Sequence, residues 1–119
     1  MGSLSRPGDG VLFLPAQRRE SRLTHPGDFA GRPDLALGQG PVSSGTLYGI
    51  ERAPGEIRAR MLTVDRIVTL TDPPGRPRDN PPTPQDHMKE TVLAGRFERC
   101  ARRTAGGLVI SVYARRGRC

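Results

Sequence analysis

The sequence predicts a mainly β fold with one short helix. Two runs carry this prediction: residues 57–71 are rich in β-branched side chains, and residues 107–113 (Gly-Leu-Val-Ile-Ser-Val-Tyr) form a continuous β-type segment. Pro54-Gly55 and Pro73-Pro-Gly75 flank the first run as turn signals. The 15 Gly and 12 Pro in 119 residues, with no Trp and 3 Phe, leave few side chains to fill a large core.

The chain divides by composition into two regions. Residues 1–45 are predicted to be an irregular or disordered segment, in which Val11–Leu14 is a candidate short strand. Residues 46–119 are predicted to be a small β-rich domain with a Pro-rich loop at 72–86 and a basic C-terminal end.

Residues 46–71 are predicted to form an antiparallel hairpin that turns at Ala53-Pro-Gly55. A helix is the alternative for the second half of this segment, since Ile57, Met61, Val64 and Val68 fall on one helical face. The β-branched content favours the strand, with a bend near Asp65.

A helix is predicted from His87 to about Arg103, capped by Asp86. Its apolar stripe would be Met88, Val92, Leu93, Phe97 and Cys100. Gly95 disfavours the helix by about 1 kcal/mol relative to Ala, so a strand at 91–97 is the alternative.

Positive charge is concentrated at the C-terminal end. The net charge is +7, and residues 96–119 hold seven Arg and one acid. Such a segment can bind phosphates of nucleic acid, for which the candidates are Arg99, Arg102, Arg103, Arg115 and Arg116. Phe97 and Tyr113 are the only nearby aromatics, so phosphate contact without sequence readout is expected rather than a base-stacking platform. A GC-rich coding sequence is the alternative explanation for the excess of Arg.

Catalysis, metal binding and cofactor binding are not expected. His25 and His87 do not lie near other ligands at metal-binding spacing, and the Gly pairs lack the setting of a phosphate loop. Cys100 and Cys119 could form one bridge in an oxidising compartment. Neither a secretory leader nor a membrane-spanning run is evident, so a cytoplasmic protein that does not bind membranes is predicted.

One segment resembles a known family. Leu47-Tyr48-Gly49, followed by Arg60-Met-Leu-Thr-Val-Asp-Arg-Ile67, is similar to the core of the WYL domain of bacterial transcriptional regulators. The resemblance covers about 35 residues, and Leu47, Gly49 and Leu62 depart from the family pattern. It implies a small SH3-like partial barrel, in truncated form, that binds a nucleotide or nucleic acid. On this resemblance Tyr48, Arg60 and Arg66 would bind the ligand.

Residues 78–84 also match a short peptide motif. Arg78, Pro81 and Pro84 fit the pattern Arg-x-x-Pro-x-x-Pro that SH3 domains bind as a polyproline helix. A stiff linker is the alternative.

The sequence therefore predicts a non-enzymatic ligand- or nucleic-acid-binding module of the WYL type, with a role in transcription regulation. The alternatives are an Arg-rich, partly disordered protein that binds nucleic acid or an SH3-like partner, and a reading-frame product without an evolved role.

Overall fold

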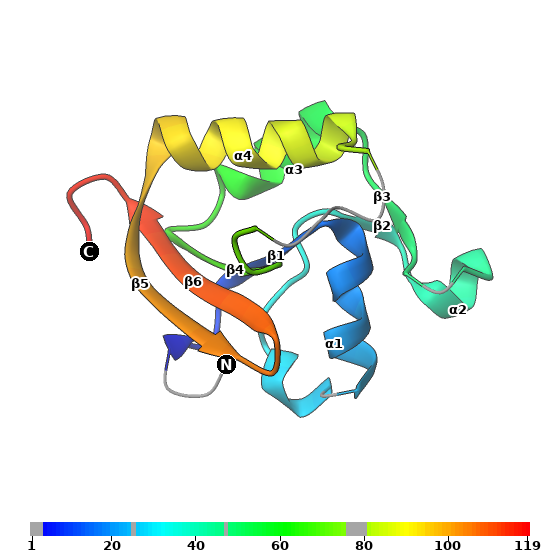
Figure 1. Ribbon diagram of the computed structural model, residues 1–119. Helices are drawn as coiled ribbons and strands as arrows, with labels where there is room; N and C mark the ends of the chain where they lie inside the picture. Colours follow the sequence, from blue (N-terminus) through cyan, green and yellow to red (C-terminus); the bar gives the residue numbers. More distant parts are fainter. Residues whose placement is uncertain (1–3, 25, 47, 76–80) are drawn as a thin grey trace.

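The computed structural model describes residues 4–24, 26–46, 48–75 and 81–119, and a four-stranded mixed sheet lies at its centre (Figure 1). The strand order is β1-β4-β6-β5, with β1 parallel to β4 and the other neighbours antiparallel. The strands are β1 (Gly10–Leu14), β4 (Arg66–Thr71), β5 (Phe97–Ala105) and β6 (Leu108–Arg115). A separate two-stranded sheet pairs β2 (Leu37–Gln39) with β3 (Ile50–Glu51).

Helical segments surround this sheet. They are η2 (Ala16–Arg19), α1 (Glu20–Thr24), η3 (Pro26–Phe29), α2 (Pro41–Ser44), α3 (Pro54–Met61) and α4 (Pro84–Arg96). Helices α3 and α4 pack together along one side of the sheet (Figure 1). The fold is thus mixed α/β.

The prediction of a mainly β fold with an SH3-like partial barrel is wrong, because the sheet is open. The outer edge of β1 is occupied by another segment: Val11 N donates to Pro33 O at 2.9 Å, and Leu35 N donates to Val11 O at 3.1 Å. At the other end of the strand order, β5 pairs with β6 alone among the described residues. The edges β1 and β5 therefore do not meet, as closure of a barrel requires.

The predicted hairpin at 46–71 is also wrong. Pro54 is the first residue of α3 rather than part of a turn, a position where its fixed φ and missing N–H suit a helix. Ile57 and Met61, one helical turn apart, are both fully buried, so the helical alternative describes the first half of the run. The β-branched residues from Ile67 onward do form a strand, β4, but β3 pairs with β2 instead.

Helix α4 begins near the predicted position and ends earlier. Thr83 is its N-cap, with the Thr83 hydroxyl accepting from Asp86 N at 3.1 Å, so the predicted cap at Asp86 lies three residues inside. The helix ends at Arg96 rather than about Arg103, because Phe97 is extended and starts β5. The alternative strand at 91–97 is not seen.

The predicted strand at 107–113 is confirmed as β6, and the candidate strand at Val11–Leu14 is confirmed as β1. Strand β1 is buried on both faces. Residues 1–45, expected to be irregular, therefore supply one strand of the main sheet.

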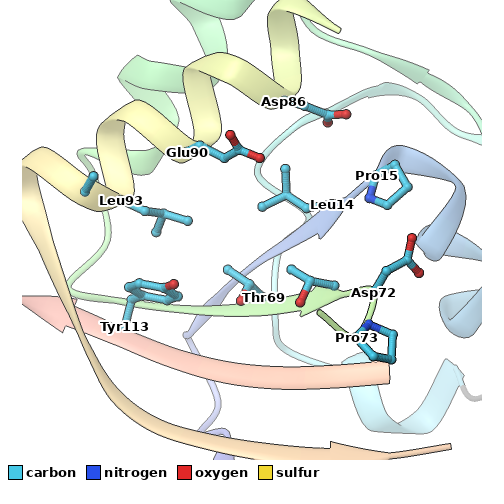
Figure 2. Close-up of a pocket in the computed structure, with 11 residues that line it drawn as sticks. Leu14, Pro15, Thr69, Asp72, Pro73, Asp86, Glu90, Leu93 and Tyr113 are labelled. Atoms are coloured by element: carbon cyan, nitrogen blue, oxygen red, sulfur yellow. The ribbon is translucent and has the colours of Figure 1, made fainter. Parts of the chain in front are cut away.

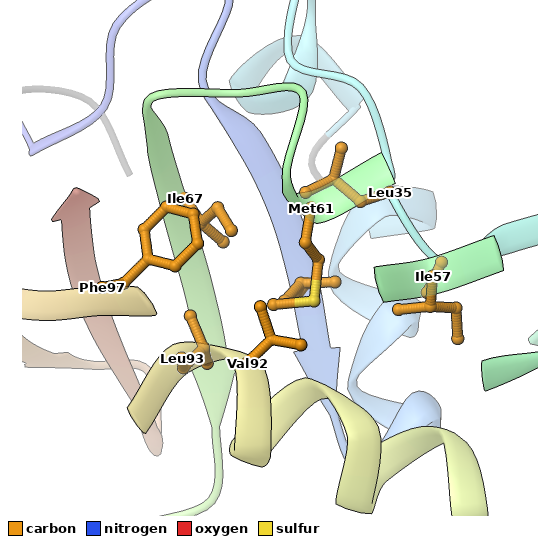
Figure 3. Packing of buried hydrophobic residues seen from close by; sticks show 9 residues of the cluster. Leu35, Ile57, Met61, Ile67, Val92, Leu93 and Phe97 are labelled. Carbon is orange, nitrogen blue, oxygen red and sulfur yellow. The ribbon is translucent and has the colours of Figure 1, made fainter. Parts of the chain in front are cut away.

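The two faces of the sheet carry separate hydrophobic clusters. On the first face, Ile57 and Met61 of α3 and Val92 and Leu93 of α4 pack with strand residues such as Ile67 (Figure 3). On the second face, Phe29 of η3 covers a set of alternating strand residues: Val11, Phe13, Val68, Leu70, Ile110 and Val112. Because neighbouring residues of β1 and β4 point to opposite faces, both clusters share the same two strands.

Candidate nucleic-acid interface

The edge strand β5 and the segment after β6 carry a group of exposed arginines. Arg99, Arg102 and Arg103 are exposed on β5, and Arg118 is exposed near the C-terminus. We call these four residues the arginine edge. The single acid of residues 96–119, Glu98, accepts from Gly117 N at 2.9 Å.

An irregularity in β5 places two of these arginines on the same face of the sheet. Arg99 pairs with Tyr113 and Arg102 pairs with Ser111, and the register shifts between Arg99 and Ala101. Residues opposite each other in antiparallel strands share a face, and so do residues two apart on one strand. In a regular strand without a bulge, positions 99 and 102 are three residues apart and would face opposite ways. The bulge thus puts Arg99 and Arg102 on the face that α4 partly covers.

A disulfide holds the C-terminal segment beside β5. Cys100, the extra residue of the bulge, is bonded to Cys119, with 5.3 Å between their Cα atoms. Arg118 N also donates to Arg115 O at 2.9 Å and closes a turn. Disulfides are more common in oxidising compartments than in the cytoplasm, and the cytoplasmic location expected from the sequence stays a prediction.

Two of the arginines predicted to bind nucleic acid have contacts within the protein. The Arg115 guanidinium donates to Leu62 O and Val64 O and lies 5.0 Å from the centre of the Phe97 ring. The Arg116 guanidinium donates to Ala94 O at 2.6 Å, near the C-terminal end of α4 where free carbonyls attract cations. These two side chains therefore connect β6 and the segment after it to other parts of the fold.

The residues assigned by the WYL resemblance contact different segments. Arg60 lies on α3 and donates from Nε to Leu35 O at 2.9 Å. Arg66 begins β4, donates to Leu4 O at 3.0 Å and lies 3.3 Å from Asp9 Oδ1. Tyr48 is half-buried, and its carbonyl accepts from Arg19. The resemblance also used Leu47, which lies outside the described residues.

The proline motif falls partly outside the described residues. Arg78 is not described, Pro81 is exposed, and Pro84 is the first residue of α4. The last position of the motif is therefore helical rather than polyproline-like.

A cavity of about 430 Å³ lies on the same sheet face as Arg99 and Arg102 (Figure 2). It is found where the parallel strands β1 and β4 end, beneath α4. Open α/β sheets commonly bind ligands beyond the carboxyl ends of their parallel strands. Leu14 and Leu93 contribute apolar wall, and the polar lining residues are Thr69, Thr71, Asp72, Asp86, Glu90 and Tyr113.

Buried charges behind the cavity are paired with one another. Arg19 Nε donates to Asp34 Oδ2 at 2.6 Å, and a terminal nitrogen of Arg19 donates to Glu51 Oε2 at 2.9 Å. Lys89, which is fully buried, donates to Glu51 at 2.7 Å and to Asp86 at 3.3 Å. Burial alone would lower the pKa of Arg19, but its hydrogen bonds and charge interactions with Asp34 and Glu51 raise it overall. The arginine is therefore charged at neutral pH.

We call Arg19, Asp34, Glu51, Lys89 and Asp86 the buried charge cluster. It joins η2, the segment near Asp34, β3 and α4. Breaking one pair would leave an uncompensated buried charge, so the cluster constrains how α4 lies over the sheet.

Sequence reasoning identified the arginines of the edge but missed the cavity. The sequence predicts that Tyr113 lies on a strand and that Asp86 begins a helix, but it predicts a site for neither. Two features of the sequence could have indicated the cavity. Asp72 directly follows a strand rich in β-branched residues, and Asp86 and Glu90 lie four residues apart at the start of a helix, on one of its faces.

Within the described part of the chain, no group of three or more His, Cys, Asp or Glu side chains is arranged to hold a metal ion. No helix there is long and apolar enough to cross a membrane.

Comparison of the chain with protein-family models, with curated proteins and with solved structures gave no match.

Proposed function

We propose that this protein binds single-stranded nucleic acid through the arginine edge. The observation that carries the proposal is the exposed pair Arg99 and Arg102, which the bulge places on one face of an edge strand. Arginine offers a planar fork that pairs with phosphate oxygens. A rigid strand reduces the conformational freedom lost when such side chains bind.

The surroundings of the edge favour an anionic polymer. Residues 96–119 carry seven of the eighteen arginines and a single acid, so the local field is strongly positive. When arginines neutralise the phosphates, the counterions bound to those phosphates are released. This release would supply most of the binding free energy.

A single strand fits this edge better than a duplex. Proteins that read duplex DNA with strands insert a two-stranded ribbon into the major groove. Here β6 is flanked by β4 as well as β5, so the β5–β6 pair is part of a larger sheet rather than a separate two-stranded ribbon. A single strand requires only a line of phosphate contacts along β5.

The WYL resemblance suggests the same ligand chemistry through other residues. Binding at Tyr48, Arg60 and Arg66, like a role in transcription regulation, stays a prediction. The arginine edge is preferred because Arg60 and Arg66 already donate to backbone carbonyls.

The test is fluorescence anisotropy with a labelled oligothymidylate at several salt concentrations. We expect the logarithm of the association constant to fall linearly with the logarithm of salt concentration, by about 0.7 for each phosphate contacted. The double variant Arg99→Gln/Arg102→Gln should reduce this slope by about 1.4.

A charge-matched control uses Arg58, an exposed arginine on α3. Arg58→Gln should leave the slope and the affinity nearly unchanged. If Arg58→Gln weakens binding as much as either single edge substitution, net charge rather than the edge is responsible. Equal or tighter binding of a duplex would contradict the choice of a single strand.

A further inference from the structure

We propose that the cavity beneath α4 binds a small primary amine with an apolar body, and that Asp86 pairs with the ammonium group of this ligand. Three features support such a ligand: the size and apolar walls of the cavity, the incomplete pairing of Asp86, and the buried hydroxyl of Thr69. None of the four residues of the arginine edge takes part, so this site is separate from the proposed binding of nucleic acid.

The cavity has the size and walls of a small-ligand site. Its volume of about 430 Å³ lies within the range of roughly 300–1,000 Å³ typical of such sites. Leu14 from β1 and Leu93 from α4 reach into it, and Tyr113 lines it from β6 (Figure 2). A bare metal ion would fill little of this volume, so the walls suit an organic molecule with an apolar body.

The charged lining favours a cation. Asp72, Asp86 and Glu90 line the cavity, and no Lys, Arg or His is among its described lining residues. Asp72 lies 3.3 Å from Arg18 Nε, and Glu90 also has an interaction of its own, so neither is assigned to the ligand. Asp86 is the member of the buried charge cluster that lines the cavity, and its pairing decides the assignment.

Asp86 is less completely paired than the other acids of the buried charge cluster. Its side chain is 5% exposed, and its side-chain hydrogen bond within the described ranges joins Oδ1 to Lys89 Nζ at 3.3 Å. The same nitrogen lies closer to Glu51, at 2.7 Å. Asp34, in contrast, accepts two hydrogen bonds from Arg19, at 2.6 and 3.1 Å. Because a buried carboxylate with little compensation is costly, a cation that donates to the second oxygen of Asp86 would be bound favourably.

A buried hydroxyl supplies a second acceptor. Thr69 is 2% exposed and lines the cavity from β4. Its hydroxyl makes no hydrogen bond with any residue that the structure describes, although buried hydroxyls are usually hydrogen-bonded. An ammonium group has three donors and no acceptor. It can therefore donate to the Asp86 carboxylate and to the Thr69 hydroxyl together.

The positions of the polar and apolar walls set the shape of the ligand. Asp86 and Leu93 are seven residues apart on α4, which corresponds to about 10 Å along the helix axis. Tyr113 lies toward the Leu93 end of the cavity, away from Asp86 (Figure 2). An ammonium group at Asp86 and a ring between Leu93 and Tyr113 require a short linker, and an aromatic ring packs well against Tyr113. A phenyl ring joined to a primary amine by two carbons has this form.

The exposed arginines of β5 do not exclude a cation at Asp86. Arg99 is opposite Tyr113 in the β5–β6 register, so it lies at the ring end of the ligand. Strand β5 is two strands away from β4, which corresponds to about 10 Å. The charges of Arg99 and Arg102 are exposed and screened by salt, whereas the buried Asp86 acts in surroundings of lower dielectric constant.

The test is a titration of the folded chain, followed by amide NMR spectra, with three ligands that share a phenyl ring and differ in charge. These are phenethylamine, phenethyl alcohol and phenylacetate, each at neutral pH and the same ionic strength. Phenethylamine should bind at least about tenfold more tightly than the alcohol, as expected for hydrogen bonds between charged groups, and phenylacetate should bind most weakly. The amides of Leu93 and Tyr113 should be among those that shift. Equal affinity for the amine and the alcohol, or tighter binding of phenylacetate, would overturn the assignment.

Two variants and a matched control locate the effect. Asp86→Asn keeps the shape of the side chain and should weaken phenethylamine at least about tenfold, with the affinity for phenethyl alcohol nearly unchanged. Thr69→Val should weaken the amine by about fivefold, the loss of one hydrogen bond. Asp65→Asn changes an exposed carboxylate that precedes β4 and does not line the cavity, so it should have no effect on either ligand.

Circular dichroism shows whether each variant is folded. An Asp86→Asn variant that is folded and binds phenethylamine as tightly as the wild type would contradict the role of Asp86. If Asp86→Asn does not fold, the comparison of the amine, the alcohol and the acid on the wild-type chain still decides whether the cavity selects a cation.

Discussion

The two ends of the sheet use charge in opposite ways. Behind the cavity, above β1 and β4, charges of both signs are buried and paired within the buried charge cluster. Along β5, at the other end of the strand order, charges of one sign are exposed in the arginine edge. Arg19 and Arg102 are the same residue type, yet the first contributes to the fold and the second is available for binding.

Burial explains the difference. A charge removed from water needs partners close to it, and Arg19 has Asp34 and Glu51 within hydrogen-bond distance. An exposed charge needs no partner and contributes little to stability. Substitutions at the two ends should therefore separate effects on folding from effects on binding.

The largest effect is expected for Lys89→Met. This change removes the cation that contacts Glu51 and Asp86 in the interior, and breaking a buried pair typically costs about 3–5 kcal/mol. The free energy of unfolding in urea should fall by that amount. A loss below about 1 kcal/mol would mean that the buried charge cluster does not constrain the fold.

The next largest effect concerns the disulfide. The variant Cys100→Ser/Cys119→Ser opens a loop between residues 19 apart in sequence, and closing a loop of that size stabilises a protein by about 3 kcal/mol. Arg118 would then be held beside β5 by hydrogen bonds alone. We expect the salt slope for oligothymidylate to decrease by at most about 0.7, the contribution of one phosphate contact. A larger decrease would show that the bond also positions the arginines of β5.

Arg115→Met should have an intermediate effect on stability and little effect on binding. Its guanidinium donates to Leu62 O and Val64 O, and unpaired carbonyls of this kind cost about 1–3 kcal/mol. Thermal unfolding and anisotropy on the same samples would measure both quantities. An unchanged melting temperature together with weaker oligothymidylate binding would show that Arg115 contacts the nucleic acid rather than supporting the fold.

The smallest effect on stability is expected at the arginine edge itself. Arg102→Gln should change the free energy of unfolding by no more than about 0.5 kcal/mol, as is usual for exposed positions. The affinity for oligothymidylate should fall nonetheless. If stability fell by more than about 1 kcal/mol, Arg102 would belong with the arginines that support the fold.

The sequence correctly predicts the elements that depend on local residue patterns. Its predictions are wrong where contacts between distant segments determine whether a segment is a helix or a strand. β6 and β1 were evident from their apolar runs, and α4 from its helical periodicity. Pro54-Gly55 signals a turn and a helix start equally well, and the burial of Ile57 and Met61 against α4 decides for the helix. The arginines were evident from composition. Their grouping was not, because it depends on the register of β5 against β6.

The cavity depends on tertiary structure even more strongly. Its lining comes from β1, β4, α4 and β6. No short motif joins Asp72, Glu90 and Tyr113, which meet only because β1 and β4 are parallel and α4 crosses above them. The periodicity of a strand or a helix shows which face a residue lies on, but it does not show which residues of different elements line one cavity.

The bulge in β5 has a consequence for insertions and deletions. Since Cys100 is the extra residue, a chain without it could keep the observed pairs of Arg99 with Tyr113 and of Arg102 with Ser111. Both arginines would stay on the same face, and Cys119 would lose its partner. A single codon could therefore add or remove the covalent link to the C-terminus while the sheet keeps its alignment. In homologous chains, the length of this strand would vary together with the presence of a terminal cysteine.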